Sequence, residues 1–322
     1  MMLLRLLGRT KLYWGLVGLF VFGVLSSPIT SRGHNIFLSS GNLSDVLRQV
    51  SITGLVAVGM TMVILIAGID LSVGSVLAFG SVVTALLLTE PGWSTGAMIA
   101  VPTSVLVAFV VTAALTRFVA TGLRQRQPQA TADGRAGHGM PASLGIWLPL
   151  GIGVLSAGLA AVWLVPGGAQ KFGILSLLFM VPCVGLVIGA IVGLIIVVGR
   201  LQPFIVTLAA MVTLLGLARL AAGQDSAVIA VYSRSNATAD IDILRRVLWG
   251  FVPVPGLFFL GALLVFTFVL KFTVFGRYLY ALGGNEEATR LSGIAVVPVK
   301  IATYAFSGML SALAAVLFVA QY

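Results

Sequence analysis

The sequence is poor in charge and almost devoid of cysteine and histidine. Only 9% of its 322 residues are charged, against roughly 25% in ordinary soluble domains. Hydrophobic residues make up 59%, more than a soluble domain of this length can bury. Cys183 is the single cysteine, which excludes a disulfide within the chain, and His34 and His138 are too few to suggest a His/Cys metal site. The composition therefore excludes soluble enzymes, disordered proteins and secreted disulfide scaffolds, and it indicates an all-α polytopic membrane protein.

Motifs of catalysis and nucleotide binding are also absent. None of the four lysines follows a glycine, so the chain has no P-loop with which to bind ATP. The patterns HExxH, GxSxG and CxxC do not occur, and no nucleophile is accompanied by a candidate base. We expect no enzymatic activity, no cofactor and no metal bound by this chain.

Apolar runs predict about nine transmembrane helices, some short or broken, in a single membrane-spanning domain. The expected spans are 12–29, 51–67, 72–89, 96–116, 143–165, 176–199, 203–222, 249–273 and 298–320. Residues 31–50 are amphipathic and are expected to lie along the outer interface. An alternative for the first span is a signal peptide, but its end at 25–28 lacks a clear small-x-small cleavage pattern, which favours an uncleaved helix.

The net charge of +10 is explained by membrane orientation rather than by a nucleic-acid partner. Cytoplasmic loops of membrane proteins carry an excess of Lys and Arg. With the N-terminus inside, alternation of nine spans places 12 of the 19 Lys and Arg residues on the cytoplasmic side. The inside segments would include a linker at 117–142, the turn at Arg200 and the segment 271–300. We therefore expect a cytoplasmic N-terminus and a chain embedded in the lipid bilayer.

Small residues recur at helical spacing in two of the expected spans. Gly185, Gly189 and Gly193 form two overlapping GxxxG steps, and Ser307, Ser311 and Ala315 repeat the small-xxx-small spacing. Such stripes allow membrane helices to approach closely, so we interpret both as packing faces.

A first candidate site is centred on Asp70, the only acid between Asp45 and Glu90. A carboxylate at the centre of a bilayer costs about 2.5–3.5 kcal/mol and needs a partner, water or a helix N-terminus. Asp70 either caps the third span in a short cytoplasmic turn or belongs to a broken helix whose ends line a passage. The candidate residues for the pathway or its gate are Gly68, Asp70, Ser72, Gly74 and Ser75.

A second candidate site follows residue 275. The sequence predicts a basic and aromatic turn, two glycines, a helix cap at Asn285 and a short helix that starts with two glutamates. A folded helix between two spans is either a docking surface for a partner or a plain linker. The candidate residues are Gly276, Arg277, Gly284, Asn285, Glu286, Glu287, Arg290 and Gly293.

Three blocks of sequence resemble a known family. VGMTMVI at 58–64 leads into GIDLSVGS at 68–75, QPFIVTL follows at 202–208, and the third block runs from Gly276 to Ile294. Together they resemble the permease subunits of bacterial ABC importers for sugars, of the ribose, galactose and xylose type. The blocks are spread over most of residues 40–322.

The resemblance implies a transport function in the bacterial inner membrane. Such permeases form a homodimeric pore, receive a monosaccharide from a periplasmic sugar-binding protein and couple to a separate cytoplasmic ATPase that uses ATP. Residues 276–295 would then be the cytoplasmic coupling loop, with Thr289 where alanine is commoner. A competing hypothesis is an ion-coupled secondary transporter of a small polar solute, for which Asp70 is the one good candidate residue. A membrane-embedded enzyme is a third possibility, but no catalytic set supports it.

The sequence departs from that family in two places. Residues 117–175 resemble an insertion that adds a linker and a span. The chain also stops at Tyr322, where family members continue through a glycine-rich re-entrant segment and final helices. The resemblance therefore implies a chain that lacks the C-terminal part of the family.

Overall fold

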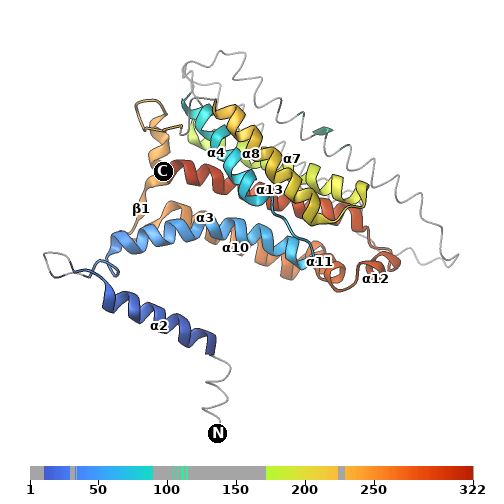
Figure 1. Cartoon of the computed structure of the whole chain (residues 1–322), viewed down its shortest axis with the longest axis horizontal. Helices are drawn as coiled ribbons and strands as arrows, with labels where there is room; N and C mark the ends of the chain where they lie inside the picture. Colours follow the sequence, from blue (N-terminus) through green and yellow to red (C-terminus); the bar gives the residue numbers. More distant parts are fainter. Residues whose placement is uncertain are drawn as a thin grey trace, which may run out of the picture.

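The structure is a computed structural model of the chain, and it describes residues 11–29, 33, 35–89, 104, 107, 110, 111, 114, 172–223 and 229–321. These segments are almost entirely helical (Figure 1). The longer helices are α2 (Lys11–Ser26), α3 (Ser40–Leu65), α4 (Val73–Thr89), α7 (Ile174–Gly199), α8 (Pro203–Ala222), α10 (Val254–Phe272) and α13 (Val296–Gln321). The shorter elements are η1 (Ala239–Ile241), α9 (Asp242–Arg245), β1 (Val247–Leu248), β2 (Val252–Pro253), α11 (Val274–Gly284) and α12 (Glu286–Leu291). The predicted all-α class is confirmed.

Most of the predicted spans coincide with helices. Within the described part of the chain, α3, α7, α8, α10 and α13 are long and apolar enough to cross a membrane, and α2 and α4 are shorter apolar helices. The predicted spans 96–116 and 143–165 and the linker 117–142 lie outside the described residues, apart from five scattered positions in the first of them.

Two predicted boundaries are wrong. The Ser39 hydroxyl accepts a hydrogen bond from the Asn42 amide at 3.2 Å and thereby starts α3 at Ser40, so residues 40–50 belong to this helix rather than to a separate interfacial segment. The span expected from residue 249 begins only at Val254. A small hairpin precedes it, because Trp249 and Gly250 both adopt positive φ, the backbone geometry of a tight turn between antiparallel strands.

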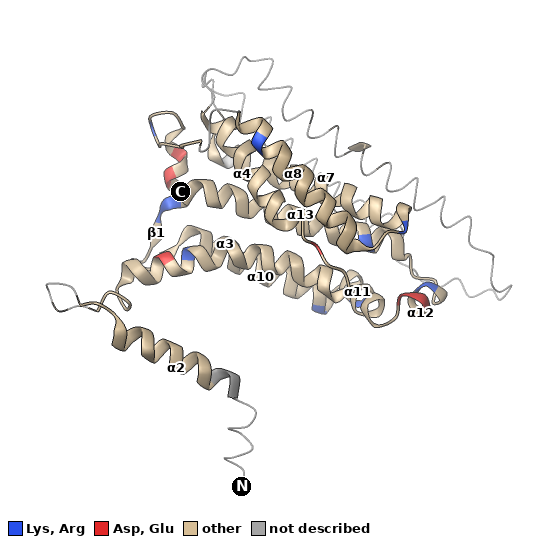
Figure 2. Ribbon diagram, in the orientation of Figure 1, with Lys and Arg blue, Asp and Glu red and all other residues tan. Residues whose placement is uncertain are grey.

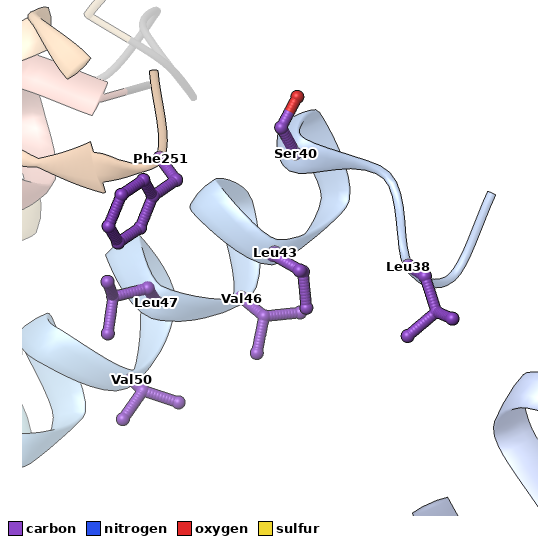
Figure 3. Close-up of a pocket in the computed structure, with 7 residues that line it drawn as sticks. All are labelled: Leu38, Ser40, Leu43, Val46, Leu47, Val50 and Phe251. Atoms are coloured by element: carbon purple, nitrogen blue, oxygen red, sulfur yellow. The ribbon is translucent and has the colours of Figure 1, made fainter. Parts of the chain in front are cut away.

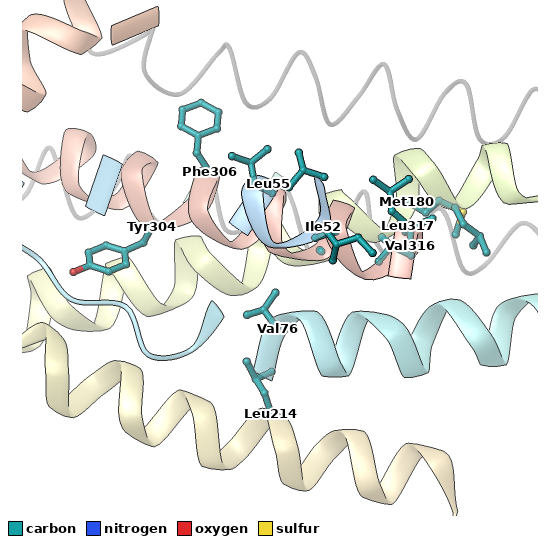
Figure 4. Packing of buried hydrophobic residues seen from close by; sticks show 14 of the residues in the cluster. Ile52, Leu55, Val76, Met180, Leu214, Tyr304, Phe306, Val316 and Leu317 are labelled. Carbon is teal, nitrogen blue, oxygen red and sulfur yellow. The ribbon is translucent and has the colours of Figure 1, made fainter. Parts of the chain in front are cut away.

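Helix α13 lies at the centre of the described bundle. It packs against α7 and α4 on one side and against α3 on the other, and α10 covers the outer side of α3 (Figure 1). Most of its residues are buried, and Tyr304, Phe306, Val316 and Leu317 contribute large side chains to the core (Figure 4). By contrast, α8 and α10 bury only a few of their apolar side chains, as expected for helices in contact with lipid or further membrane segments.

The predicted glycine stripe of α7 packs on α13, but not on the stripe predicted there. Ser307 and Ala315 of that second stripe instead meet Gly59 of α3 and Gly80 of α4. A Cβ on Gly185 would collide with the carbonyl oxygen of Gly308, and one on Gly189 would collide with the carbonyl oxygen of Tyr304. Helices α7 and α13 are therefore in backbone contact, which only residues without bulky side chains permit. Charged residues of the long helices lie toward the helix ends rather than their middles (Figure 2), the distribution that a hydrocarbon environment requires.

Candidate functional site

Asp70 is buried and fully engaged in hydrogen bonds. Asp70 is only 3% exposed. One carboxylate oxygen accepts from the Ser72 amide at 3.0 Å and from the Ser72 hydroxyl at 2.6 Å, and the other accepts from the Ser307 hydroxyl at 2.9 Å. Three donors offset much of the cost of removing a carboxylate from water. The backbone donor belongs to Ser72, one residue before α4, so Asp70 fixes the approach to that helix.

Asp70 lies inside the bundle and not in a turn beyond its end. Its partner Ser307 is close to the middle of the 26-residue α13. Gly59 of α3 also meets Ser307, since a Cβ on Gly59 would lie 3.0 Å from the Ser307 Cα. The chain therefore passes the level of Ser307 within α3, continues to Leu65, returns through residues 66–72 and starts α4 halfway along α13. The chain thus reverses between α3 and α4, and Asp70 binds the Ser72 amide before α4 inside the bundle.

The return of the chain begins with a tight helix end. The Gly68 amide donates to the Val63 carbonyl and the Ala67 amide to the Ile64 carbonyl, both at 2.9 Å, which is the paired bonding of a Schellman motif. Ala67 adopts a φ of +56° at the position where glycine is usual. Holding a residue with a Cβ in this conformation costs about 1–2 kcal/mol, so the surrounding packing determines the turn.

Tyr304 covers the returning segment. A Cβ on Gly68 would lie 2.7 Å from the Tyr304 hydroxyl oxygen, so only glycine fits beneath the phenol. The Tyr304 side chain is 1% exposed, and its hydroxyl has no hydrogen-bond partner among the described residues. Figure 4 shows this ring at the edge of the core.

The predicted pathway residues are in different environments. Ser72 and Ser75 are buried, and the Ser75 hydroxyl donates to the Ser72 carbonyl at 2.7 Å across the first turn of α4. Gly74 is exposed, and a Cβ there would meet no atom within 4 Å. Four of the five residues thus belong to one buried cluster, and Gly74 lies outside it.

The second predicted site is more helical than expected. Residues 274–284, interpreted from sequence as a turn, form α11, because the Thr273 side chain caps the Gly276 amide at 3.3 Å. Gly276 is buried directly against the Leu270 carbonyl at the end of α10. Arg277 and Gly284 are exposed on α11. The turn prediction is wrong because the local cap and the apolar face of α11 outweigh its glycines.

Helix α12 agrees with the sequence prediction at both of its ends. The Asn285 side chain accepts from the Ala288 amide at 2.9 Å and starts the helix before Glu286. Gly293 adopts a φ of +81° where the chain leaves the helix. Glu287 and Arg290 form a hydrogen-bonded ion pair on the exposed surface, and this bond raises the pKa of the Arg290 guanidinium. The other acidic residue of α12, Glu286, forms an ion pair with Lys300 of α13.

All three sequence blocks converge on residues 66–72. Gly283 of α11 packs on the carbonyl of Leu65, where α3 ends, and a Cβ on this glycine would collide with that oxygen. The Thr207 hydroxyl of the second block donates to the Pro203 carbonyl at 2.9 Å and lies 3.4 Å from the Ile69 carbonyl. Helices α11, α8 and α13 therefore all contact this part of the chain, and Ile69 remains 49% exposed.

Sequence analysis did not identify Lys300, Tyr304 and Thr207 as site residues. Ser307 was noted, but only as part of a packing stripe. The stripe does carry a usable signal, because a hydroxyl on a buried face can serve as a donor to an acid buried elsewhere.

A groove on the described surface lies away from this site. It has a volume of about 450 Å³ beside the start of α3 and is lined by Leu38, Ser40, Leu43, Val46, Leu47, Val50 and Phe251 (Figure 3). Ser40 supplies its one polar side chain. A binding site for a polar solute needs several convergent polar groups, so this groove is not a candidate for such a site.

A bundle of long apolar helices, with a buried carboxylate where the chain returns between two of them, defines a multi-pass membrane protein. The chain belongs to the permease family described as "branched-chain amino acid transport system / permease component", which matches residues 42–126 and 141–322.

Several curated relatives are similar over most of the chain. The ribose import permease protein of Haemophilus influenzae is 32% identical over 92% of the chain, and that of Escherichia coli K12 is 30% identical over 92%. The xylose transport system permease protein of Escherichia coli K12 is 32% identical over 86%. The chain covers 66%, 67% and 64% of these three relatives, about two thirds of their length. No solved structure matches the chain.

Proposed function

We propose that the chain is the permease subunit of an ATP-binding-cassette importer that carries a monosaccharide across the bacterial inner membrane. The observation that carries this proposal is its similarity to ribose and xylose import permeases over 86–92% of its length. Energy would come from a separate cytoplasmic ATPase subunit, and sugar from a periplasmic binding protein. The active unit would be a homodimer whose N-termini face the cytoplasm.

In the mechanism we propose, the loop 276–295 acts as the lever and the residues around Asp70 act as the gate. An ATPase dimer that closes on ATP would move α12 and α11, which would then displace residues 66–72 and the start of α4. Asp70, Ser72 and Ser75 would change partners as this segment moves, opening a path on one side of the membrane and then on the other. The proposal is supported by the contact of Gly283 with Leu65 and the hydrogen bond from Ser307 to Asp70.

An uptake assay tests the function. The chain would be expressed with an ABC ATPase and a periplasmic sugar-binding protein from the same organism, in cells that lack their own ribose and xylose permeases. Uptake of labelled pentose should require all three proteins and stop when the Walker A lysine of the ATPase is replaced. Uptake that continues without the ATPase and collapses with a protonophore would instead establish an ion-coupled transporter.

A labelling experiment tests the orientation. Ala288 is exposed on α12, so Ala288→Cys should react with a membrane-impermeant maleimide in inside-out vesicles only. Labelling in intact spheroplasts would place this helix on the periplasmic side and contradict the coupling role.

A further inference from the structure

Helix α12 has little packing of its own to hold it in place. It is six residues long, and Thr289 is its one buried residue. A helix this short is not stable by itself, so contacts with neighbouring elements must fix its orientation. If α12 receives force from a partner, those contacts decide where the force goes.

One ion pair joins α12 to α13. The Lys300 ammonium donates to both carboxylate oxygens of Glu286, at 2.6 and 2.7 Å. The Lys300 side chain is 21% exposed and that of Glu286 54%, so the lysine end of the pair is well shielded. The other pair on α12, Glu287 with Arg290, lies within the helix and cannot link it to anything else.

Lys300 lies on the same face of α13 as the residues that contact the segment 66–72. Positions 300, 304 and 307 have the i, i+4, i+7 spacing that places side chains on one face of a helix. Tyr304 covers Gly68, and Ser307 donates to Asp70. The distance along α13 from Lys300 to Ser307 is about 10 Å. Because α13 is one continuous helix, a displacement at Lys300 would be carried along it to Ser307.

We infer that Lys300 is the positioning residue that fastens the coupling helix to α13, and that motion of α12 thereby reaches Gly68 and Asp70 through Tyr304 and Ser307. The effect on transport rests on the proposed importer function, but the fastening of α12 to α13 is a property of the chain alone. It assigns a role to the ion pair of Lys300 and Glu286, rather than to Glu286 alone as an acid recognised by a partner protein.

Charge exchange tests the inference in the complete transporter. Lys300→Met keeps the aliphatic stem and removes the charge, and Glu286→Lys reverses the other partner. Each should lower the sugar imported per ATP hydrolysed by about fivefold or more, while ATP hydrolysis continues. The double variant Glu286→Lys/Lys300→Glu should recover most of the loss, which recognition of Glu286 by a partner protein would not produce. Continued ATP hydrolysis in the single variants excludes a general loss of folding as the cause. Asp45→Asn, which breaks an exposed i, i+3 pair with Arg48 near the start of α3, is the matched control and should keep the original ratio.

A spectroscopic measurement tests the fastening without any transport. Spin labels at Ala288→Cys and Phe318→Cys, in a Cys183→Ala background, report the orientation of α12 relative to α13 through their distance distribution. Lys300→Met should broaden this distribution, and the charge-exchanged pair should narrow it again. An unchanged distribution in Lys300→Met, or no recovery in the exchanged pair, overturns the inference. A broadened distribution in a protein that imports no sugar would contradict the proposed function and leave the fastening supported.

Discussion

Ser307 donates a hydrogen bond of 2.9 Å to Asp70, although the two residues are 237 positions apart in the chain. Both are buried, and the bond joins the segment 66–72 to the middle of the central helix α13. It therefore links the site of the proposed gate to the helix that carries the proposed lever.

Replacement of Ser307 by alanine should destabilise the protein. The change leaves a buried carboxylate oxygen without its donor, at a cost of about 1–3 kcal/mol. The measurement is the midpoint of thermal unfolding in detergent. Ser311→Ala is the control, since the Ser311 hydroxyl donates to a carbonyl of its own helix, and its loss should have a much smaller effect. Equal shifts for the two variants would argue against a specific role for the bond to Asp70.

Replacement of Asp70 separates the importer from the ion-coupled alternative. Asp70→Asn keeps an oxygen for the two Ser72 donors and an amide that can donate to the Ser307 hydroxyl, so the fold should be retained. We expect ATP-dependent sugar uptake to continue in this variant, with a changed rate. Asp70→Leu leaves all three donors unpaired and should abolish the folded protein. Complete loss of uptake by a well-folded Asp70→Asn protein would favour a transporter that carries an ion on this carboxylate.

A side chain at Gly189 should separate α7 from α13. Gly189→Ala places a methyl group against the Tyr304 carbonyl, and such overpacking costs about 1–3 kcal/mol. The same unfolding midpoint measures the loss. Gly216→Ala in α8 provides the comparison, because a Cβ there meets nothing within 4 Å and alanine favours a helix by up to about 1 kcal/mol. A neutral Gly189→Ala would mean that the two backbones are not in contact.

Changes within α12 and just after it should uncouple transport from ATP hydrolysis. Gly293→Val forces a β-branched residue into a φ of +81°, at a cost of roughly 1–2 kcal/mol, and Glu287→Arg reverses the acidic end of the ion pair with Arg290. Both variants should insert in the membrane at normal levels, measured by immunoblot, and lose most sugar uptake. Normal uptake by both would refute the coupling role of this loop.

Sequence patterns alone predicted much of the fold. Apolar runs located α4, α7, α8 and α13 to within a few residues, because the length of a membrane helix is set by the thickness of the hydrocarbon core. The cap at Asn285 and the end at Gly293 were also predicted, since both depend on the local preferences of asparagine and glycine. The start of α3 and the helix α11 were missed although each begins at a local cap, Ser39 and Thr273, because the polar residues and glycines beside these caps favoured other structures.

The chemistry of single residues fixed which side chains would be important, and the tertiary structure fixed what they contact. A lone acid in an apolar stretch must find donors, so Asp70 is conspicuous in the sequence by itself. Its donor Ser307 and the pairing of Glu286 with Lys300 join separate elements of the chain, and no local pattern encodes such contacts. They arise because the backbone contact of α7 with α13 sets the position of α13. In that position one face of α13 contacts both α12 and the segment 66–72.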